Sequence, residues 1–200
     1  ITAIYRQRFV MLVWGLGGAA LLAVGAAATR KGRQRRMAQR APRRSPDATS
    51  LRSTALGTLI GFDNRGTHAW WGIPYAQAPV GPLRWKAPRP VLPWQRTREA
   101  LAFGAVAPQF AGATLLSPRS QWNQVTGEED CLTLNIFAPR FEPHTVPQGG
   151  KRLPVMVWIH GGANTVGASA TYRTLRNAAR QDGVIVVSVN YRLGLLGWFN

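Results

Sequence analysis

Short apolar runs separated by turn residues make up most of the chain beyond residue 55. Val155–Ile159 is an unbroken apolar run that stops at His160, Gly161 and Gly162. A run of this kind is typical of a strand in a parallel sheet that is buried on both faces. Val184–Val189 has nearly the same continuous apolar character. The two runs therefore predict buried parallel strands.

The period of the pattern predicts the other elements. Thr58–Phe62 and Thr67–Ile73 are rich in β-formers and flank the turn signal of residues 63–66, which predicts an antiparallel hairpin. Cys131–Phe137 alternates and predicts a strand, and Ser169–Gln181 has helical spacing. The order hairpin, strand, strand, helix, strand indicates an α/β fold class with a mixed sheet that turns parallel.

The N-terminus carries a different pattern. Phe9–Ala28 holds no charge and follows two arginines. At about 1.5 Å per residue it would form roughly 30 Å of helix, enough to cross a bilayer. It ends in small residues, as a cleaved signal does, whereas the basic cluster after it favours retention in the cytoplasm. We expect residues 1–28 to be a signal peptide or membrane anchor, so that the protein is secreted, in the cell envelope or membrane-anchored. The alternative is that Met37 is the true start, which would make the protein cytoplasmic.

Residues 29–55 are expected to form a basic linker, with the folded domain over residues 56–200. Of the net charge of +17, residues 1–50 carry +9, from ten Lys and Arg against one acid. The linker is short of large apolar residues and cannot build a core, so we expect it to be disordered. An anionic membrane surface is one expected partner, and a solvated tether is the alternative. We expect no nucleic-acid partner, because the arm has no interleaved aromatic residues and no such motif.

Two glycines give the end of the Val155–Ile159 run its candidate chemistry. Gly161 and Gly162 let the chain turn sharply and expose backbone N–H groups. Paired N–H groups at a strand end are what an ester hydrolase needs to hold a developing oxyanion, and His-Gly-Gly after a strand is a form that this loop takes in α/β-hydrolases. The alternative is a plain turn in which the glycines only permit a positive φ.

Three blocks in this order carry a resemblance to one family. Gly72–Trp85 has the sequence GIPYAQAPVGPLRW, Glu129–Pro139 has EDCLTLNIFAP, and the third block runs from VMVWIHGG at Val155 to VNYRLG at Gly194. Together they resemble the N-terminal portion of the type-B carboxylesterase family, which includes the cholinesterases. The resemblance covers residues 56–200. It implies an incomplete α/β-hydrolase fold, with the N-terminal hairpin and the first strands of a mixed, mainly parallel sheet.

The resemblance also implies roles around the glycines. The N–H groups of Gly162 and Ala163 would be the oxyanion-hole donors, while His160 and Gly161 would shape the loop. Ala163 stands where many members have glycine, which is tolerable because only the N–H is used. Asn164 stands where an aromatic or large apolar residue is common, so the acyl side of the pocket departs from the family pattern.

Two further implications concern structure rather than chemistry. Arg84 and Glu129 would form a structural ion pair. Cysteines at the position of Cys131 often bond to one just before an upstream Pro-Gln, and here Ala107 stands at that place. We therefore expect Cys131 to be a small buried apolar residue and not a nucleophile.

A serine hydrolase of this fold also needs a serine on a Gly-x-Ser-x-Gly elbow, then an acid and a histidine. No such elbow occurs in the 200 residues, and the nearest segment, Gly167–Thr171, lacks the second glycine. The family places the elbow a few tens of residues after Tyr191. We therefore expect the nucleophile, acid and base to be absent from this chain, and His68, His144 and His160 to be non-catalytic. No cofactor and no metal is implied.

Two classes of function remain open. In the first, the chain is the N-terminal fragment of a serine carboxylic-ester hydrolase that acts on small-molecule esters, and the fragment alone is inactive. In the second, it belongs to a non-catalytic relative that keeps the fold for binding or adhesion, because a fold does not guarantee chemistry. The retained oxyanion loop favours the esterase.

Overall fold

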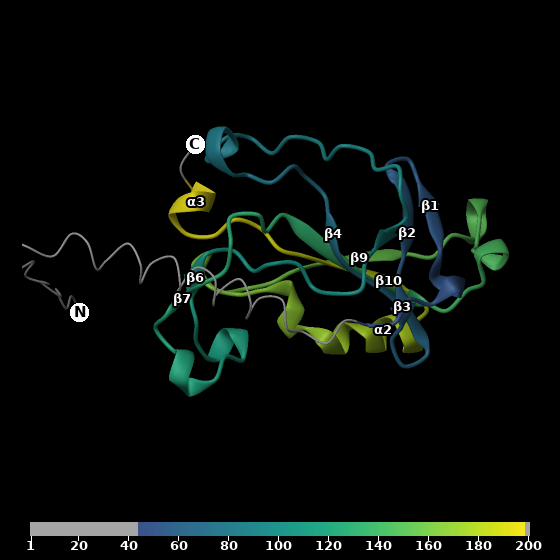
Figure 1. Ribbon diagram of the computed structural model, residues 1–200. Coiled ribbons are helices and arrows are strands. Elements are labelled where there is room, and N and C mark those ends of the chain that lie inside the picture. The colour runs from purple at the N-terminus through teal and green to yellow at the C-terminus, as the bar shows by residue number, and fades with distance from the viewer. Residues whose placement is uncertain (1–43, 199–200) are drawn as a thin grey trace, which may run out of the picture. The chain divides into compact units, whose positions relative to one another are not determined.

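A computed structural model describes residues 44–198 (Figure 1). The predicted signal or anchor of residues 1–28 and most of the predicted linker lie outside this range. Within it, no helix is both long and apolar enough to span a membrane. The strands are β1 Arg52–Thr54, β2 Gly57–Ile60, β3 Phe62–Asp63, β4 Thr67–Pro74, β5 Arg98–Glu99, β6 Gln109–Phe110, β7 Val125–Thr126, β8 Thr133–Pro139, β9 Val155–Ile159 and β10 Ile185–Val189. The α-helices are α2 Arg176–Gln181 and α3 Leu195–Trp198, and the 3-10 helices are η1 Ala48–Ser50, η2 Gly81–Leu83, η3 Ala113–Leu115, η4 Arg119–Gln121, η5 Pro143–Thr145, η6 Gly149–Lys151, η7 Ser169–Thr171 and η8 Arg173–Leu175.

The largest sheet has five strands in the order β3-β4-β8-β10-β9. β10 pairs with β9 in parallel, whereas the other three pairings are antiparallel. The sheet is mixed, as predicted, but among the described strands it is mainly antiparallel and not mainly parallel. A parallel neighbour needs a crossover connection, and among the described strands of this sheet only the segment between β9 and β10 supplies one, with α2 in it. Smaller sheets have the orders β1-β2-β5 and β6-β7.

The predicted hairpin is present between β3 and β4, which pair antiparallel. The N–H of Asn64 donates to the carbonyl of Thr67 at 2.7 Å and closes the turn. The first predicted strand, Thr58–Phe62, is divided, because β2 joins the three-stranded sheet and β3 the five-stranded one. The division falls at Gly61, where a side chain would overlap the backbone of Ala69.

The folded part begins before residue 56. Ser50 is fully buried, and its hydroxyl accepts a hydrogen bond from the Gly61 N–H at 2.8 Å. Its carbonyl accepts one from the indole N–H of Trp70 at 3.0 Å. β1 then pairs antiparallel with β2. The prediction of a disordered linker is therefore wrong for residues 48–54. Hydrogen bonds hold this segment in place, and it has no apolar run that would have indicated order from the sequence.

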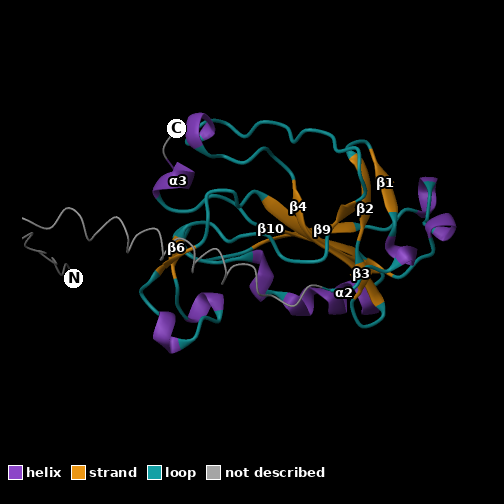
Figure 2. Cartoon of the chain, in the orientation of Figure 1, coloured by secondary structure: helices purple, strands orange, loops and turns teal. Residues whose placement is uncertain are grey.

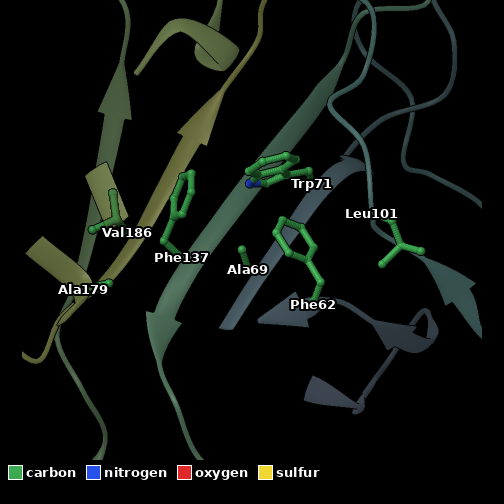
Figure 3. Close-up of a cluster of buried hydrophobic side chains, with 7 residues drawn as sticks. All are labelled: Phe62, Ala69, Trp71, Leu101, Phe137, Ala179 and Val186. Carbon is green, nitrogen blue, oxygen red and sulfur yellow. The ribbon is translucent and has the colours of Figure 1, made fainter. Parts of the chain in front are cut away.

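The main core lies between the five-stranded sheet and α2 (Figure 3). Trp71 of β4 stacks on Phe103 with ring centroids 3.8 Å apart, and Phe62 of β3 meets it edge-on at 4.6 Å. Strands β3, β4, β8 and β10 all contribute to this core, so it ties the hairpin to the crossover helix. Its buried members are Phe62, Ala69, Trp71, Leu101, Phe137, Ala179 and Val186.

The segment Ser169–Gln181 is α-helical only at its end. It consists of η7, η8 and the six-residue α2 (Figure 2). The N–H of Ser169 donates to Asn190 Oδ1 at 2.9 Å, so the start of the segment is bound to the end of β10 and does not begin an α-helix. Ala179 is buried in the core and Ala178 packs against it, as the helical spacing predicts.

β9 is parallel to β10, as predicted, but it is not buried. It is the edge strand, and the side chains of Val155–Ile159 are 36–68% exposed. α2 packs on β8 and β10 (Figure 1), and among the described residues the Tyr172 ring lies 5.2 Å from that of Trp158 but leaves β9 largely exposed. The prediction of burial is wrong for this part of the protein, because a continuous apolar run is buried only where other elements cover both faces of the sheet.

Candidate functional site

The chain folds back on itself after β9 in residues 160–167, here called the glycine loop. The carbonyl of Gly162 accepts hydrogen bonds from the N–H groups of Thr165 at 3.0 Å and Val166 at 3.1 Å. Gly162 has a φ of +136°, and a Cβ there would overlap the carbonyl oxygen of Val166. Only glycine therefore fits at this position.

The N–H groups of Gly162 and Ala163 take no part in these internal bonds. Among the hydrogen bonds of residues 44–198, none uses either group as donor. Ala163 has a φ of +51° and is exposed, and Gly162 is partly exposed. Adjacent open N–H donors can hold a negatively charged oxygen. Their role as oxyanion donors stays a prediction.

His160 and Tyr191 form the entry to the loop. The two rings stack with centroids 4.5 Å apart, and the Tyr191 hydroxyl donates to the His160 carbonyl at 2.5 Å. Nδ1 of His160 lies 3.1 Å from the carbonyl oxygen of Gly161, which can only accept, so Nδ1 carries the proton. The imidazole is 3% exposed, and burial lowers its pKa. A neutral ring fixed in this way supports a shaping role.

Gln109 of β6 binds the exit of the loop. Its Oε1 accepts from the N–H of Gly167 at 2.7 Å, and its Nε2 donates to the carbonyls of Gly167 at 2.9 Å and Ala107 at 3.0 Å. The Gln109 side chain is buried. Gly167 itself packs so closely on His160 that a Cβ would overlap Nδ1. The two ends of the loop therefore touch.

A buried polar network follows the loop. Nδ2 of Asn135 in β8 donates to the hydroxyl of Ser169 at 2.8 Å, and its Oδ1 accepts from the N–H of Gly72 at 3.0 Å. Asn190 accepts from the N–H of Ser169 and donates to the carbonyl of Ala105 at 3.1 Å. Ser169, the serine nearest to a nucleophile motif, is 2% exposed and has a structural place in this network.

Arg84 and Glu129 lie in direct contact. Nε and Nη2 of Arg84 each donate to a Glu129 carboxylate oxygen at 2.6 Å. The hydrogen bond that Arg84 donates to Glu129 raises the pKa of Arg84. The two side chains are 40% and 25% exposed, so the pair joins two distant segments at a partly covered surface. The contact has the bidentate geometry that arginine favours.

Cys131 is free and fully buried, and it packs in one cluster with Ala107. Burial raises the pKa of its thiol to about 11, because the thiolate is poorly solvated there. This environment makes it an inert apolar residue, as predicted. Within residues 44–198, no group of three or more His, Cys, Asp or Glu side chains is arranged to hold a metal ion.

The polar side chains that hold the loop and the network had no predicted role: Gln109, Tyr191, Asn135 and Asn190. Their partners lie far away along the chain, 58 residues for Gln109 and Gly167. Asn190 and Tyr191 stand directly after a predicted strand and belong to the third block of the family resemblance. Gln109 belongs to the upstream Pro-Gln of that resemblance, but no local signal links its side chain to Gly167.

Known proteins resemble this chain in sequence over the described region. The family model described as "Carboxylesterase family" matches residues 48–200. The para-nitrobenzyl esterase of Bacillus subtilis is 43% identical over 150 residues, which cover 74% of this chain and 28% of that protein. Carboxylesterase 3 of Homo sapiens is 38% identical over 162 residues, or 78% of this chain and 27% of the relative.

Solved structures are similar in the same region. One structure of a PNB esterase has a TM-score of 0.61 and 42% identity, and it covers 75% of this chain and 29% of its own. A carboxylesterase of Geobacillus stearothermophilus has a TM-score of 0.60 and 36% identity, over 74% of this chain and 27% of its own. The chain thus spans less than a third of the length of these relatives. It belongs to the carboxylesterase family.

Proposed function

We propose that the full-length protein containing this chain is a serine carboxylic-ester hydrolase, and that the glycine loop forms part of its oxyanion hole. The observation that carries the proposal is the pair of unengaged N–H groups of Gly162 and Ala163 after β9. Relatives whose names are esterases, such as para-nitrobenzyl esterase and carboxylesterase 3, support a carboxylic ester as the substrate class.

In this reaction the chain would stabilise the negative charge that develops on the ester carbonyl oxygen. A serine from the remainder of the protein would attack the ester carbonyl, and its proton would pass to a histidine from the same remainder. As the carbonyl oxygen gains negative charge, the N–H groups of Gly162 and Ala163 would donate to it. The alcohol leaves, and water then releases the acid from the acyl-serine.

Turnover and covalent labelling of the full-length protein test this proposal together. We expect hydrolysis of 4-nitrophenyl acetate, and loss of that activity when a fluorophosphonate modifies a single serine. A protein that neither hydrolyses the ester nor takes up the label would instead be a non-catalytic binding relative. Turnover that persists after labelling would contradict the serine mechanism.

We also propose that residues 1–28 direct the protein to the cell envelope or anchor it there. The uncharged apolar stretch Phe9–Ala28 within them supports this. N-terminal sequencing of the mature protein tests it. A mature chain that begins at Met37 and stays in the cytoplasm would contradict it.

A further inference from the structure

We propose that Gln109 is a positioning residue for the glycine loop, an inference that rests on the proposed function. Gln109 makes all three hydrogen bonds of its side chain to backbone groups, two of them to Gly167. It therefore binds Gly167 as a neighbouring strand would, since the side chain accepts one hydrogen bond from the Gly167 N–H and donates one to the Gly167 carbonyl. A single side chain fixes both the N–H and the carbonyl of Gly167.

The chemistry of this contact requires a primary amide. Oε1 faces an N–H and Nε2 faces two carbonyls, so a flipped amide would put like groups against each other at both ends. A carboxylate could accept from Gly167 but could not donate to the carbonyls. An apolar residue would leave buried N–H and carbonyl groups unpaired, at about 1–3 kcal/mol each.

The surroundings of Gln109 argue against a role in core packing. Its neighbour in β6, Phe110, is 62% exposed, and Val125 of the partner strand β7 is 59% exposed. Gln109 is the one buried residue of strands β6 and β7. Apart from the nearby Ala107 carbonyl, its side-chain hydrogen bonds to described residues go only to Gly167 of the glycine loop. Because the rest of this strand pair is exposed, we infer that the buried Gln109 side chain is there to bind the loop and not to fill a core.

Three contacts then hold the loop around its donors. Tyr191 fixes the entry through the His160 carbonyl, the N–H of Gly194 donates to the carbonyl of Asn164 at 2.7 Å, and Gln109 fixes the exit. The N–H groups of Gly162 and Ala163 lie between the entry and the Asn164 contact. Releasing the exit removes one of the three constraints. A misplacement of about 1 Å at a catalytic group can lower the rate about 100-fold.

The test compares Gln109→Glu with Gln124→Glu in the full-length protein. Both changes keep the side-chain shape and add one negative charge to the same β6–β7 segment. Gln124 is exposed, and its side chain donates to the carbonyl of Ser120 at 3.0 Å and not to the glycine loop, so it is the matched control. We expect Gln109→Glu to lower kcat for 4-nitrophenyl acetate about 10- to 100-fold, with KM within about twofold, and to weaken binding of a trifluoromethyl ketone by the same factor.

Two further readouts separate positioning from a loss of folding. Activity of Gln109→Glu is expected to recover in part at lower pH, because a protonated carboxyl can donate to Gly167 again. Amide hydrogen exchange is expected to quicken at Thr165, Val166 and Gly167, the three loop amides that donate hydrogen bonds. Gln124→Glu should change neither.

The outcomes distinguish this inference from the proposed function. An active wild-type protein in which both variants have the same kcat would overturn the role of Gln109. Unchanged exchange at the three loop amides in Gln109→Glu would also overturn the role of Gln109. The exchange measurement tests this role even if the wild-type protein hydrolyses no ester. In that last case the proposed function alone fails.

Discussion

At the scale of single residues, Gly162 and Ala163 are adjacent yet tolerate different substitutions. Gly162→Ala would place a Cβ on the Val166 carbonyl at a φ of +136° and disrupt the loop. We expect kcat/KM of the full-length protein to fall at least about 100-fold, as for loss of an oxyanion donor. Ala163→Gly should keep activity within about threefold, because glycine adopts a φ of +51° without strain and keeps the N–H.

Steady-state kinetics on the two variants, with circular dichroism to show that each is folded, provide the check. Ala163→Gly is the control for disturbance of the loop in general. A Gly162→Ala protein with wild-type kcat/KM would show that the loop does not place oxyanion donors.

The buried pair Ala107 and Cys131 offers a second prediction at this scale. Both belong to one buried cluster, so Ala107→Cys brings a second thiol next to the first. A disulfide between them would close a loop of roughly 25 residues and stabilise the fold by about 3 kcal/mol. We expect the thermal midpoint to rise under oxidising conditions and to return on addition of dithiothreitol. A midpoint unaffected by reductant would show that the two sulfur atoms cannot meet.

At the scale of elements, β4 carries a buried histidine with a direct effect on pH stability. His68 is fully buried, and burial, followed by the charge of Arg52, lowers its pKa below the ordinary value of 6.5. Between that lowered pKa and 6.5 only the unfolded chain takes up the proton. Stability is therefore expected to fall as pH falls below about 6.5, by at most about 1.4 kcal/mol per pH unit for this group.

His160 contributes in the same direction, because burial lowers its pKa as well. Denaturant unfolding at about pH 7, 6 and 5 measures the slope, and His68→Gln isolates one histidine, since glutamine can still bond to Thr49. We expect a shallower pH dependence in the variant. An identical slope in both proteins would mean that the pKa of His68 is the same in the folded and the unfolded chain.

The elements also show which parts of the structure local sequence determines. The hairpin turn follows from turn residues, β8 from alternation and β10 from a continuous apolar run. Gly162 follows from a strand that ends in glycines. The exposure of β9 could not be predicted, because burial depends on what covers a strand and not on its own residues. Gln109 was missed for a similar reason, since its partner, Gly167, is 58 residues away and a lone glutamine has no period.

At the scale of the whole molecule, the proposed function makes the glycine loop one part of a larger catalytic site. The chain spans 28% of the para-nitrobenzyl esterase that it resembles, and its sequence holds no Gly-x-Ser-x-Gly. We expect the purified 200-residue chain to hydrolyse 4-nitrophenyl acetate no faster than buffer, because oxyanion donors without a nucleophile form no acyl-serine. Turnover above that background, abolished by a fluorophosphonate, would show that another serine of this chain serves as nucleophile.

The exposed β9 provides a test of how the chain relates to the full-length protein. An edge strand with five apolar residues can pair with other copies, and an edge lysine prevents this. In the 200-residue chain, Val157→Lys is expected to raise the soluble fraction in sedimentation assays with little change in stability, since Val157 is 58% exposed. In the full-length protein we expect the same variant to lower the yield of active enzyme, because covering β9 would bury an unpaired charge. Leu92→Lys, at an exposed loop residue, is the control. Full yield from Val157→Lys would mean that β9 stays an open edge in the complete protein as well.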